Sequence, residues 1–459
     1  MARPWPRSPQ AVFLFFATIM GLALIFLVPP LGGGNETLNF QRVATIAAGH
    51  VLIEPAAVPG GTVRLLRAAN AQFPEGAQAP YGYSWRQWQA LADIPLDAAT
   101  PATLEPNPIA VLHPFCYLPQ LAVYWLGAAA GLPPLWLFLL GRGAGLLAGI
   151  GLTFVAIRRM PFHGAVLAAL ALLPTISFSR STLDADQLTN GLAFFFVATV
   201  LREIVELAPI RRRTLVELAV TAFVLAQCKS AYLVLPFLVL AIPASRFANM
   251  AQKALACALI ILPGLLAALA WMIALKLTFF TGLRYRTWAG EVYPDMQSTA
   301  VLHDPFGYAI VLARSLFTTP LIPDSFIGLI GIFGPPVYMP LAYYMLLPLA
   351  FAGVALADEQ RRAVVLPLAM RALAIGILFA GLGLILTLLY VQWTGLGGPV
   401  IRGFQGRYLY PLLPLMFIFL PRAGRPFLGF GAPAWLSALG AISLVGTLFV
   451  TWSTYLAAA

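Results

Sequence analysis

Charged residues are scarce in this sequence. Only 10% of the 459 residues are Asp, Glu, Lys or Arg, whereas 60% are hydrophobic and the mean hydropathy is +0.84. Soluble domains carry about 25% charged residues, which keep their surfaces in water. This composition therefore excludes a mainly water-soluble chain and predicts an integral membrane protein, with the lipid bilayer as its solvent.

Cysteine and histidine are also sparse. The three cysteines lie in apolar stretches without metal-ligand spacing, and the four histidines are scattered: Cys116, Cys228, Cys257, His50, His113, His163 and His303. The pattern excludes a disulfide framework and a His/Cys metal cluster, so no metal ligand set is predicted. A divalent metal ion bound by carboxylates remains an alternative cofactor.

Several catalytic motifs are absent. The sequence has no Walker-type Gly-rich Lys motif, no Ser-His-Asp order and no dinucleotide-binding fingerprint. We therefore expect no nucleotide cofactor. If the protein catalyses a reaction, the driving energy must come from the substrate itself.

The net charge of +11 does not predict a nucleic-acid partner. Most of the 28 basic residues lie in short loops between apolar segments rather than on one solvated domain. This is the pattern of cytoplasmic loops under the positive-inside rule. We interpret the basic charge as a record of membrane topology.

The alternation of apolar runs and basic loops predicts an all-α polytopic membrane protein with 11 to 13 transmembrane helices, in which residues 1–459 form a single membrane domain. Arg3 and Arg7 precede the first apolar run, residues 11–30. A signal peptide has similar flanks, but the stretch after this run lacks a small-x-small cleavage site. We expect a retained first helix whose amino end is cytoplasmic.

Two regions do not fit simple counting. The runs 109–132 and 134–157 cannot both cross without leaving two arginines outside, against the charge rule. The conflict disappears if the Pro-interrupted stretch 113–120 is a surface or re-entrant helix. Residues 307–357 must make an odd number of crossings and include another partly re-entrant piece, and residues 409–420 are expected to return as a helix.

Three polar stretches are predicted to form extracytoplasmic loops: residues 31–108, 281–307 and 392–406. The first is the longest, and we expect it to carry surface helices. Within it Leu38, Val43 and Ile46 lie near helical spacing. This favours a short helix along the membrane surface between residues 36 and 50.

Four polar constellations lie near the membrane boundary. The first is Asn35, Glu36 and Asn39, directly after three glycines. A carboxylate at this depth is costly unless it has a function, and the alternative is that Glu36 only caps the surface helix. The second contains Asp184 and Asp186, between two apolar runs. Either Asp could cap a helix, which is worth about 1 kcal/mol, but two carboxylates near Arg180 and Asn190 favour a functional site.

The remaining constellations are cationic. Lys229 lies between two apolar runs, where it either snorkels to the interface or faces a cleft and meets an anion. Arg402, Gln405, Arg407 and Tyr408 lie among glycines. Arginine beside exposed main-chain N–H groups suits a phosphate, and the alternative is a tight outer hairpin with its arginines at the headgroups. Arg142 either pairs with an acid on a neighbouring helix or anchors a lipid phosphate.

Four stretches carry a resemblance to a known family: Pro29-Pro-Leu-Gly-Gly-Gly-Asn-Glu-Thr-Leu-Asn-Phe, Tyr117-Leu-Pro-Gln, Ser181-Thr-Leu-Asp-Ala-Asp-Gln-Leu-Thr-Asn and Gly403-Phe-Gln-Gly-Arg-Tyr-Leu-Tyr-Pro-Leu-Leu-Pro. They resemble, in order and over roughly Pro29 to Pro414, the bacterial membrane family called domain of unknown function 2142. That family is grouped with the type-C (GT-C) glycosyltransferases, which include protein mannosyltransferases and the aminoarabinose transferase of lipid A.

The resemblance implies an inverting transfer of a sugar from a polyprenyl-phosphate donor to a cell-envelope glycan, lipid or protein. The enzyme would be a multi-pass protein of the bacterial cytoplasmic (inner) membrane, with its active site facing outside. In such enzymes a first-loop carboxylate deprotonates the acceptor and cations stabilise the departing phosphate. Here the carboxylate corresponds to Glu36, the second acidic point to Asp184 or Asp186, and the cations to Lys229 and Arg407.

Two positions depart from the family pattern. That pattern has Asp-Glu followed by His three residues after the Glu, where this chain has Asn35, Glu36 and Asn39. An amide cannot accept a proton, so either Glu36 is the base, or Asp186 is, or the protein has lost transfer activity and is a non-catalytic membrane subunit of a glycan-assembly complex. A transporter or flippase for a lipid-linked sugar is a further alternative, although two related halves are not evident in the sequence.

Overall fold

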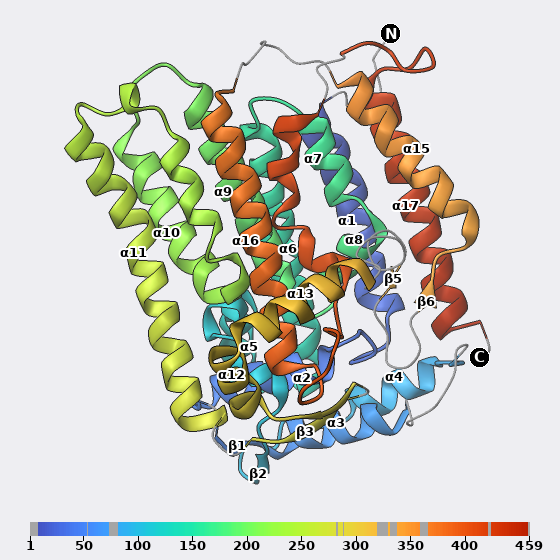
Figure 1. The fold of residues 1–459 in the computed structure, drawn as a ribbon. Coiled ribbons are helices and arrows are strands. Elements are labelled where there is room, and N and C mark those ends of the chain that lie inside the picture. Colours follow the sequence, from blue (N-terminus) through green and yellow to red (C-terminus); the bar gives the residue numbers. More distant parts are fainter. Residues whose placement is uncertain are drawn as a thin grey trace.

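The structure is a computed structural model. It describes residues 8–52, 54–72, 81–280, 283–287, 289–318, 329–330, 337–358, 366–420 and 424–457. Most of these residues are helical, which confirms an all-α membrane protein. Figure 1 shows the long helices standing side by side, with shorter elements across one end of the bundle.

Among the described residues, six helical spans are long and apolar enough to cross a membrane. They are α1 (Pro9–Leu27), α6 (Pro134–Arg159), α9 (Asp186–Val205), α11 (Met250–Leu275) with its π-helical extension η6 (Lys276–Phe280), α16 (Leu368–Gln392) and α17 (Ala432–Tyr455). The helices α7 (Gly164–Ala171) and α8 (Pro174–Ser181), bent by 64°, form a seventh crossing if they are one span. The bend falls directly before Pro174, because a residue that precedes proline disfavours the helical conformation.

Shorter elements fill the rest of the bundle. They are α5 (Leu118–Ala129), α10 (Arg212–Cys228), α13 (Pro305–Thr318) and α15 (Leu341–Ala357), with the 3₁₀ turns η1 (Pro108–Val111), η2 (Pro114–Tyr117), η3 (Ser230–Tyr232), η4 (Leu235–Ala241), η5 (Ala244–Arg246), η7 (Gly406–Leu409) and η8 (Leu413–Phe419). A two-stranded pair joins β5 (Leu329–Ile330) to β6 (Val337–Tyr338). In Figure 1, α13 lies across the long helices rather than along them.

The structure answers two of the topology questions. Residues 109–132 form two 3₁₀ turns and then α5, whose 12 residues span about 18 Å. The hydrocarbon core is about 30 Å thick, so α5 alone cannot cross it, in agreement with a surface or re-entrant stretch. The helix expected at residues 409–420 is replaced by 3₁₀ turns. Pro411 and Pro414 lack the N–H groups that a regular α-helix would need there.

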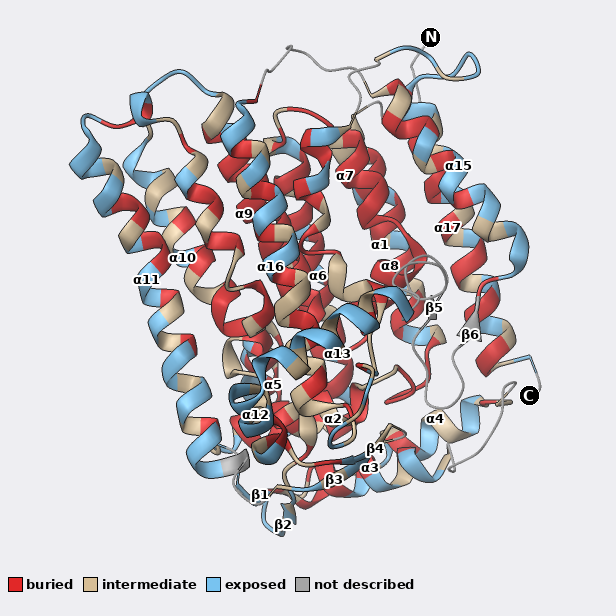
Figure 2. Ribbon diagram, in the orientation of Figure 1, coloured by how far each residue is buried: buried red, intermediate tan, exposed pale blue. Residues whose placement is uncertain are grey.

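The helix α9 forms the centre of the core. Buried residues make up 83% of its apolar window, against 28% for α11 and for α16, and Figure 2 shows exposed residues along much of α11 but buried ones on interior helices such as α7. The helices α6 and α9 approach closely because Gly145 and Gly149 of α6 face Gln187 of α9. A Cβ atom at Gly149 would lie 2.9 Å from the Gln187 main-chain oxygen, so a side chain there would separate the helices.

The described part of residues 31–108, which leaves out residues 53 and 73–80, forms a small layer across one end of the bundle, which we call the loop end. It contains α2 (Glu36–Ala47), α3 (Gly60–Gln72), α4 (Trp85–Ala92) and the antiparallel pair β1 (Ala56–Pro59) and β2 (Pro101–Leu104), with Ala56 opposite Leu104. The helix α2 confirms the short helix predicted between residues 36 and 50. The opposite end, where Arg159, Arg202 and Arg212 lie, is called the basic end.

The other two predicted loops pack against each other. The stretch 281–307 contains β3 (Tyr285–Thr287), β4 (Gly290–Val292) and α12 (Pro294–His303), while residues 281, 282 and 288 lie outside the described residues. Its Gln297 Nε2 donates to the Tyr390 carbonyl at 3.3 Å, and Leu396 N donates to the Glu291 carbonyl at 3.0 Å. These bonds fix the stretch 392–406, which leads into the Arg407 segment.

Candidate functional site

Glu36 and Arg142 form a fully buried ion pair. The Arg142 guanidinium donates from Nε to Glu36 Oε1 at 2.7 Å and from Nη2 to Oε2 at 2.5 Å, and the two side chains are at most 1% exposed. Arg142 also donates to the carbonyl oxygens of Ile25, Val28 and Pro29 at 2.7–2.9 Å. Arg142 of α6 therefore pairs with an acid, which was one of the two options that the sequence left open.

The Glu36 carboxylate receives two further donors. Gly33 N donates to Oε2 at 2.8 Å, and Leu183 N donates to Oε1 at 2.7 Å. Gly33 is required for this approach, because a Cβ there would lie 2.7 Å from the Glu36 carboxyl carbon. With four donors in place, Glu36 ties together the end of α1, the start of α2, α6 and the turn before α9. Its role as a catalytic base stays a prediction.

The amides of the first constellation lie beside this pair. Asn35 is half-buried at the start of α2, and its carbonyl accepts from Asn39 Nδ2 at 2.9 Å. Asn39 is buried, and its Oδ1 accepts from the Tyr117 hydroxyl at 2.5 Å. The Tyr117-Leu-Pro-Gln stretch thus contacts the first loop directly.

The second, third and fourth constellations meet in one cluster. The Lys229 ammonium pairs with Asp186 Oδ1, and Arg407 Nη1 donates to Asp184 Oδ2 at 2.9 Å and lies 4.0 Å from Asp186 Oδ2. The four residues come from the start of α9, the end of α10 and η7, which are far apart in the sequence. We call Asp184, Asp186, Lys229 and Arg407 the charge cluster.

Tyr408 forms one wall of the charge cluster. Lys229 Nζ lies 5.3 Å from the centre of its ring and the Arg407 guanidinium carbon lies 5.6 Å from it, which is within the range of cation–π attraction. The Tyr232 hydroxyl donates to the Tyr408 carbonyl at 2.9 Å and so holds this segment against η3. These contacts hold the side chains of Lys229 and Arg407 in one orientation beside the Tyr408 ring.

The charge cluster is partly open. The side chains of Lys229 and Arg407 are 19% and 15% exposed, whereas that of Asp186 is 3% exposed. Burial raises the pKa of Asp184 above its ordinary value, and the charge of Asp186 adds to this rise, while Arg407 and Lys229 oppose it. Asp184 Oδ1 also accepts the Asp186 N–H at 3.1 Å, but the N-cap position of α9 is Ala185, so neither aspartate is its N-cap residue.

The other predicted residues lie beside the charge cluster without joining it. The Arg402 side chain is exposed and makes no ion pair among the described residues, and its main-chain N–H donates to Thr394 Oγ1 at 3.0 Å. Gln405 is half-buried directly before η7. In the part of the chain that the structure describes, no group of three or more His, Cys, Asp or Glu side chains could hold a metal ion. The two carboxylates of the charge cluster are instead matched by two cations.

Two groups that help to position the charge cluster were not predicted from the sequence. Tyr232 and the Leu183 N–H each hold a cluster segment in place, and neither stands out in a sequence because one is an aromatic residue and the other a main-chain group. The sequence offered an acid as one possible partner of Arg142, because a buried cation needs one, but it did not identify that acid as Glu36.

The fold and the two buried ion-pair systems define an integral membrane protein with a charge cluster toward its loop end. Residues 16–416 match the family described as "Predicted membrane protein (DUF2142)", and this chain belongs to that family. The match extends over Glu36, Arg142 and the whole charge cluster. No match was found among curated proteins or among solved structures.

Proposed function

We propose that this protein is an inverting glycosyltransferase that transfers a sugar from a polyprenyl-phosphate donor to a cell-envelope acceptor. The observation that carries the proposal is the charge cluster, in which two cations and two carboxylates meet in a partly open position. In this proposal the protein has a GT-C-like topology with 11 to 13 crossings, lies in the bacterial cytoplasmic membrane, and works on its extracytoplasmic side.

The cations of the charge cluster suit the donor phosphate. Lys229 and Arg407 are the more exposed members, so a phosphate oxygen can approach them without first displacing the buried Asp186. Among the described residues, Arg407 Nε has no hydrogen-bond partner. A guanidinium with an unused N–H is a strong donor to phosphate, and fixed cations stabilise the charge that builds on a leaving phosphate.

The carboxylates of the charge cluster supply the proton acceptor. As the acceptor hydroxyl attacks the anomeric carbon, its proton passes to a carboxylate, and the electron pair of the breaking carbon–oxygen bond stays on the polyprenyl phosphate. Asp184 and Asp186 are the bases in this scheme. A raised pKa makes Asp184 a better base than an ordinary aspartate.

Glu36 has a supporting role in this proposal. Its carboxylate is occupied by Arg142 and two N–H groups, which leaves it a poor proton acceptor. It fixes Leu183, the residue directly before Asp184, and thereby positions the charge cluster. With Glu36 in this role, Asn35 in place of the family's Asp does not by itself abolish catalysis. The carboxylates of the charge cluster accept the proton instead.

The test is mass spectrometry of surface glycans and glycolipids from a strain that lacks the protein. The proposal predicts loss of one sugar and accumulation of its polyprenyl-phosphate carrier, both reversed by the wild-type gene. A second arm supplies the purified carrier directly to the outer face of membrane vesicles. Transfer by wild-type vesicles and none by deletion vesicles supports the enzyme. Equal transfer by both would support a transporter, and an unchanged glycan profile would overturn the proposal.

A further inference from the structure

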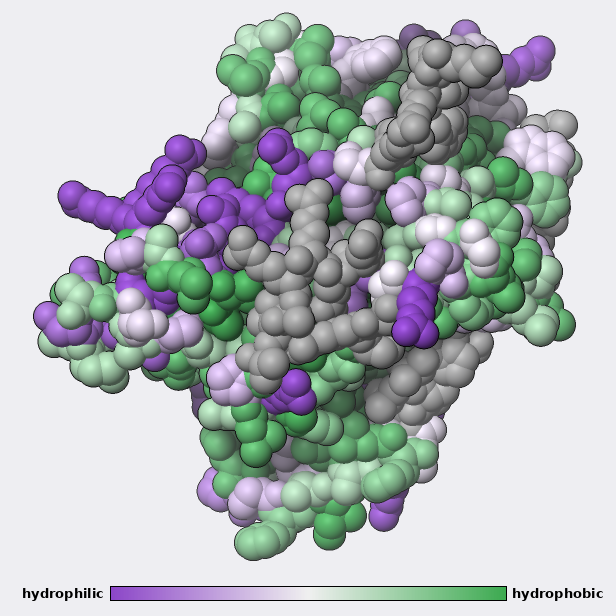
Figure 3. All heavy atoms as spheres, turned by 90° about the horizontal axis from the view of Figure 1, so that it is seen from above, coloured by the Kyte–Doolittle hydropathy of each residue, from purple (hydrophilic) through white to green (hydrophobic). Residues whose placement is uncertain are grey.

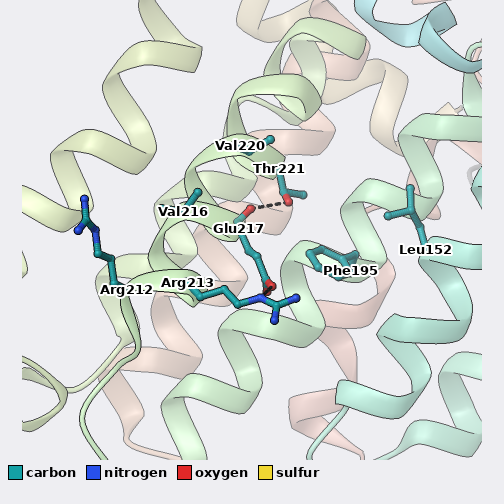
Figure 4. A pocket seen from close by; sticks show the side chains of 8 residues that line it. All are labelled: Leu152, Phe195, Arg212, Arg213, Val216, Glu217, Val220 and Thr221. Carbon is teal, nitrogen blue, oxygen red and sulfur yellow. Dashed lines mark hydrogen bonds and ion pairs between the residues drawn. The ribbon is translucent and has the colours of Figure 1, made fainter. Parts of the chain in front are cut away.

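A groove opens between α6, α9 and α10 near the basic end. It has a volume of about 580 Å³ and is lined by eight residues: Leu152, Phe195, Arg212, Arg213, Val216, Glu217, Val220 and Thr221. Figure 4 shows Arg213 reaching toward Glu217 in the middle of this set, Arg212 pointing away on one side, and Phe195 and Leu152 facing α10 from the neighbouring helices. The groove is separate from the charge cluster, which lies at the other end of α9 and α10.

The polar end of the groove carries excess positive charge. Glu217 pairs with Arg159 at 2.8 Å and with Arg213 at 3.0 Å, and Arg159 also lies 4.4 Å from the Phe195 ring centre. Arg212 is exposed. Two guanidinium groups, those of Arg159 and Arg213, therefore share one carboxylate, and Arg212 adds a further positive charge nearby. The Arg213 side chain is 88% exposed, so it can bind a second anion while Arg159 keeps Glu217 neutralised.

The other end of the groove is apolar and faces outward. Val216 and Val220, one helical turn apart on α10, are 54% and 58% exposed. In a membrane protein such side chains contact lipid chains rather than water. Val220 lies eight residues beyond Arg212, which is about 12 Å along the helix. The groove thus runs from headgroup depth into the hydrocarbon region.

This combination points to one kind of occupant. A soluble nucleotide or an acidic peptide would match the arginines but leave the apolar wall uncovered, and a neutral lipid would leave the excess positive charge unmatched. Figure 3 looks onto the basic end and shows hydrophilic side chains gathered on the side that holds α10 and α11. Basic pockets between membrane helices favour anionic lipid headgroups.

We propose that this groove binds an anionic diacyl phospholipid. Its phosphate is held by Arg213, Arg212 adds positive charge at the same end, and one acyl chain lies against Leu152, Val216 and Val220. The lipid joins α10 to α6 and α9 at the basic end. Because α10 leads directly to Lys229, the site steadies the helix that supplies one cation to the charge cluster. The proposal does not depend on the proposed glycosyltransferase activity.

The test uses the full chain purified in detergent and titrated with dioleoylphosphatidylglycerol or dioleoylphosphatidylcholine, with bound lipid counted by native mass spectrometry. We expect wild type to prefer the anionic lipid roughly tenfold or more, and Arg212→Gln/Arg213→Gln to lose that preference. The matched control, Arg86→Gln/Arg286→Gln, removes two exposed arginines from the loop end and should keep it. Val220→Trp fills the apolar end while leaving every charge, so it should weaken binding of both lipids.

Equal binding of the two lipids by wild type, or an unchanged preference in Arg212→Gln/Arg213→Gln, would overturn the proposal. If the double variant fails to fold, Arg212→Gln alone gives the same comparison, because that side chain is exposed. The single variant should then lose a smaller part of the preference. No loss in the single variant would equally count against the site.

Discussion

At the scale of single residues, Glu36 and Arg142 combine two roles that a buried charge can have. The positive and negative charges of the pair balance, so no net charge is buried. Its seven hydrogen bonds hold four separate segments in place. Such a pair gives little net stability by itself, but a single buried charge left without its partner is costly. The arrangement therefore fixes geometry more than it adds stability.

This account predicts a strong coupling between the two residues. Glu36→Gln should lower the free energy of unfolding by about 3–5 kcal/mol, because it leaves the Arg142 charge buried and unpaired. Glu36→Gln/Arg142→Met should cost clearly less than the sum of the two single variants. Thermal unfolding in detergent measures all three, and the exposed Glu105→Gln is the control that should change little. Additive losses would contradict the coupling.

A second residue-scale prediction concerns pH. Burial, together with the positive charge of Arg42, lowers the pKa of His113 from 6.5 to about 4. Below pH 6.5 the imidazole of His113 binds a proton in the unfolded chain, whereas in the folded chain it stays neutral until about pH 4. The free energy of unfolding therefore decreases as the pH falls through this window. We expect the melting temperature to fall between about pH 7 and about pH 5.

The check is His113→Asn, which keeps an acceptor for the Phe115 N–H, now received by His113 Nδ1 at 3.3 Å, but does not titrate. Its melting temperature should fall less over the same pH range. Asn in place of the exposed His303 should keep the wild-type slope. An identical slope in His113→Asn and wild type would show that His113 is not the group responsible.

Residue types at the membrane boundary allowed much of the charge cluster to be predicted. Asp184, Asp186, Lys229 and Arg407 were each singled out because a charge near lipid needs a partner, and the ion pairs bring all four together. Which acid takes which cation could not be predicted. Glu36 and Arg142 are 106 positions apart, and only the packing of α2 against α6 selects that pair over the alternatives.

At the scale of elements, the contact between α6 and α9 depends on small residues. Gly149 faces the Gln187 main chain at a distance that excludes a side chain, whereas Gly151 on the same helix has open space around it. Both positions are helical and both would gain about 1 kcal/mol of intrinsic helix preference on substitution by alanine. The difference in stability between the two alanine variants therefore reports only the effect of packing against α9.

We predict that Gly149→Ala lowers the free energy of unfolding by about 1–3 kcal/mol, since the added methyl must push α9 away. Gly151→Ala should be neutral or slightly stabilising. Thermal unfolding of the two variants in the same detergent is the measurement. A destabilisation of equal size at both positions would mean that glycine itself, and not the approach of α9, is what α6 requires.

Element type was easier to predict than element shape. The apolar run at residues 187–201 lies within the central helix α9, because a helix satisfies the main-chain polar groups of such a run in lipid. Residues 409–420 are equally apolar but fold into 3₁₀ turns around Pro411 and Pro414. Proline spacing was visible in the sequence, although its effect depends on neighbours such as Tyr232, which holds the Tyr408 carbonyl.

At the scale of the whole molecule, the charges divide between the two ends of the bundle. The basic end carries the arginines around α9 and α10, and the cluster of acids and cations lies toward the loop end. Six or seven of the predicted 11 to 13 crossings are helices that are clearly long and apolar enough among the described residues. The other crossings stay a prediction, because proline and glycine permit re-entry and a sequence alone cannot assign the depth of short or broken apolar segments.

The central claim is that the charge cluster is the reacting site, and one comparison tests it most directly. In the deletion strain, the sugar lost from surface glycans should return with wild type and with Asp97→Asn. Asp97 is an aspartate of the loop end paired with Arg64 at 2.7 Å, outside the cluster. The sugar should stay absent with Asp186→Asn and with Arg407→Gln, each present in the membrane at the wild-type level. Full restoration by either cluster variant would contradict the account.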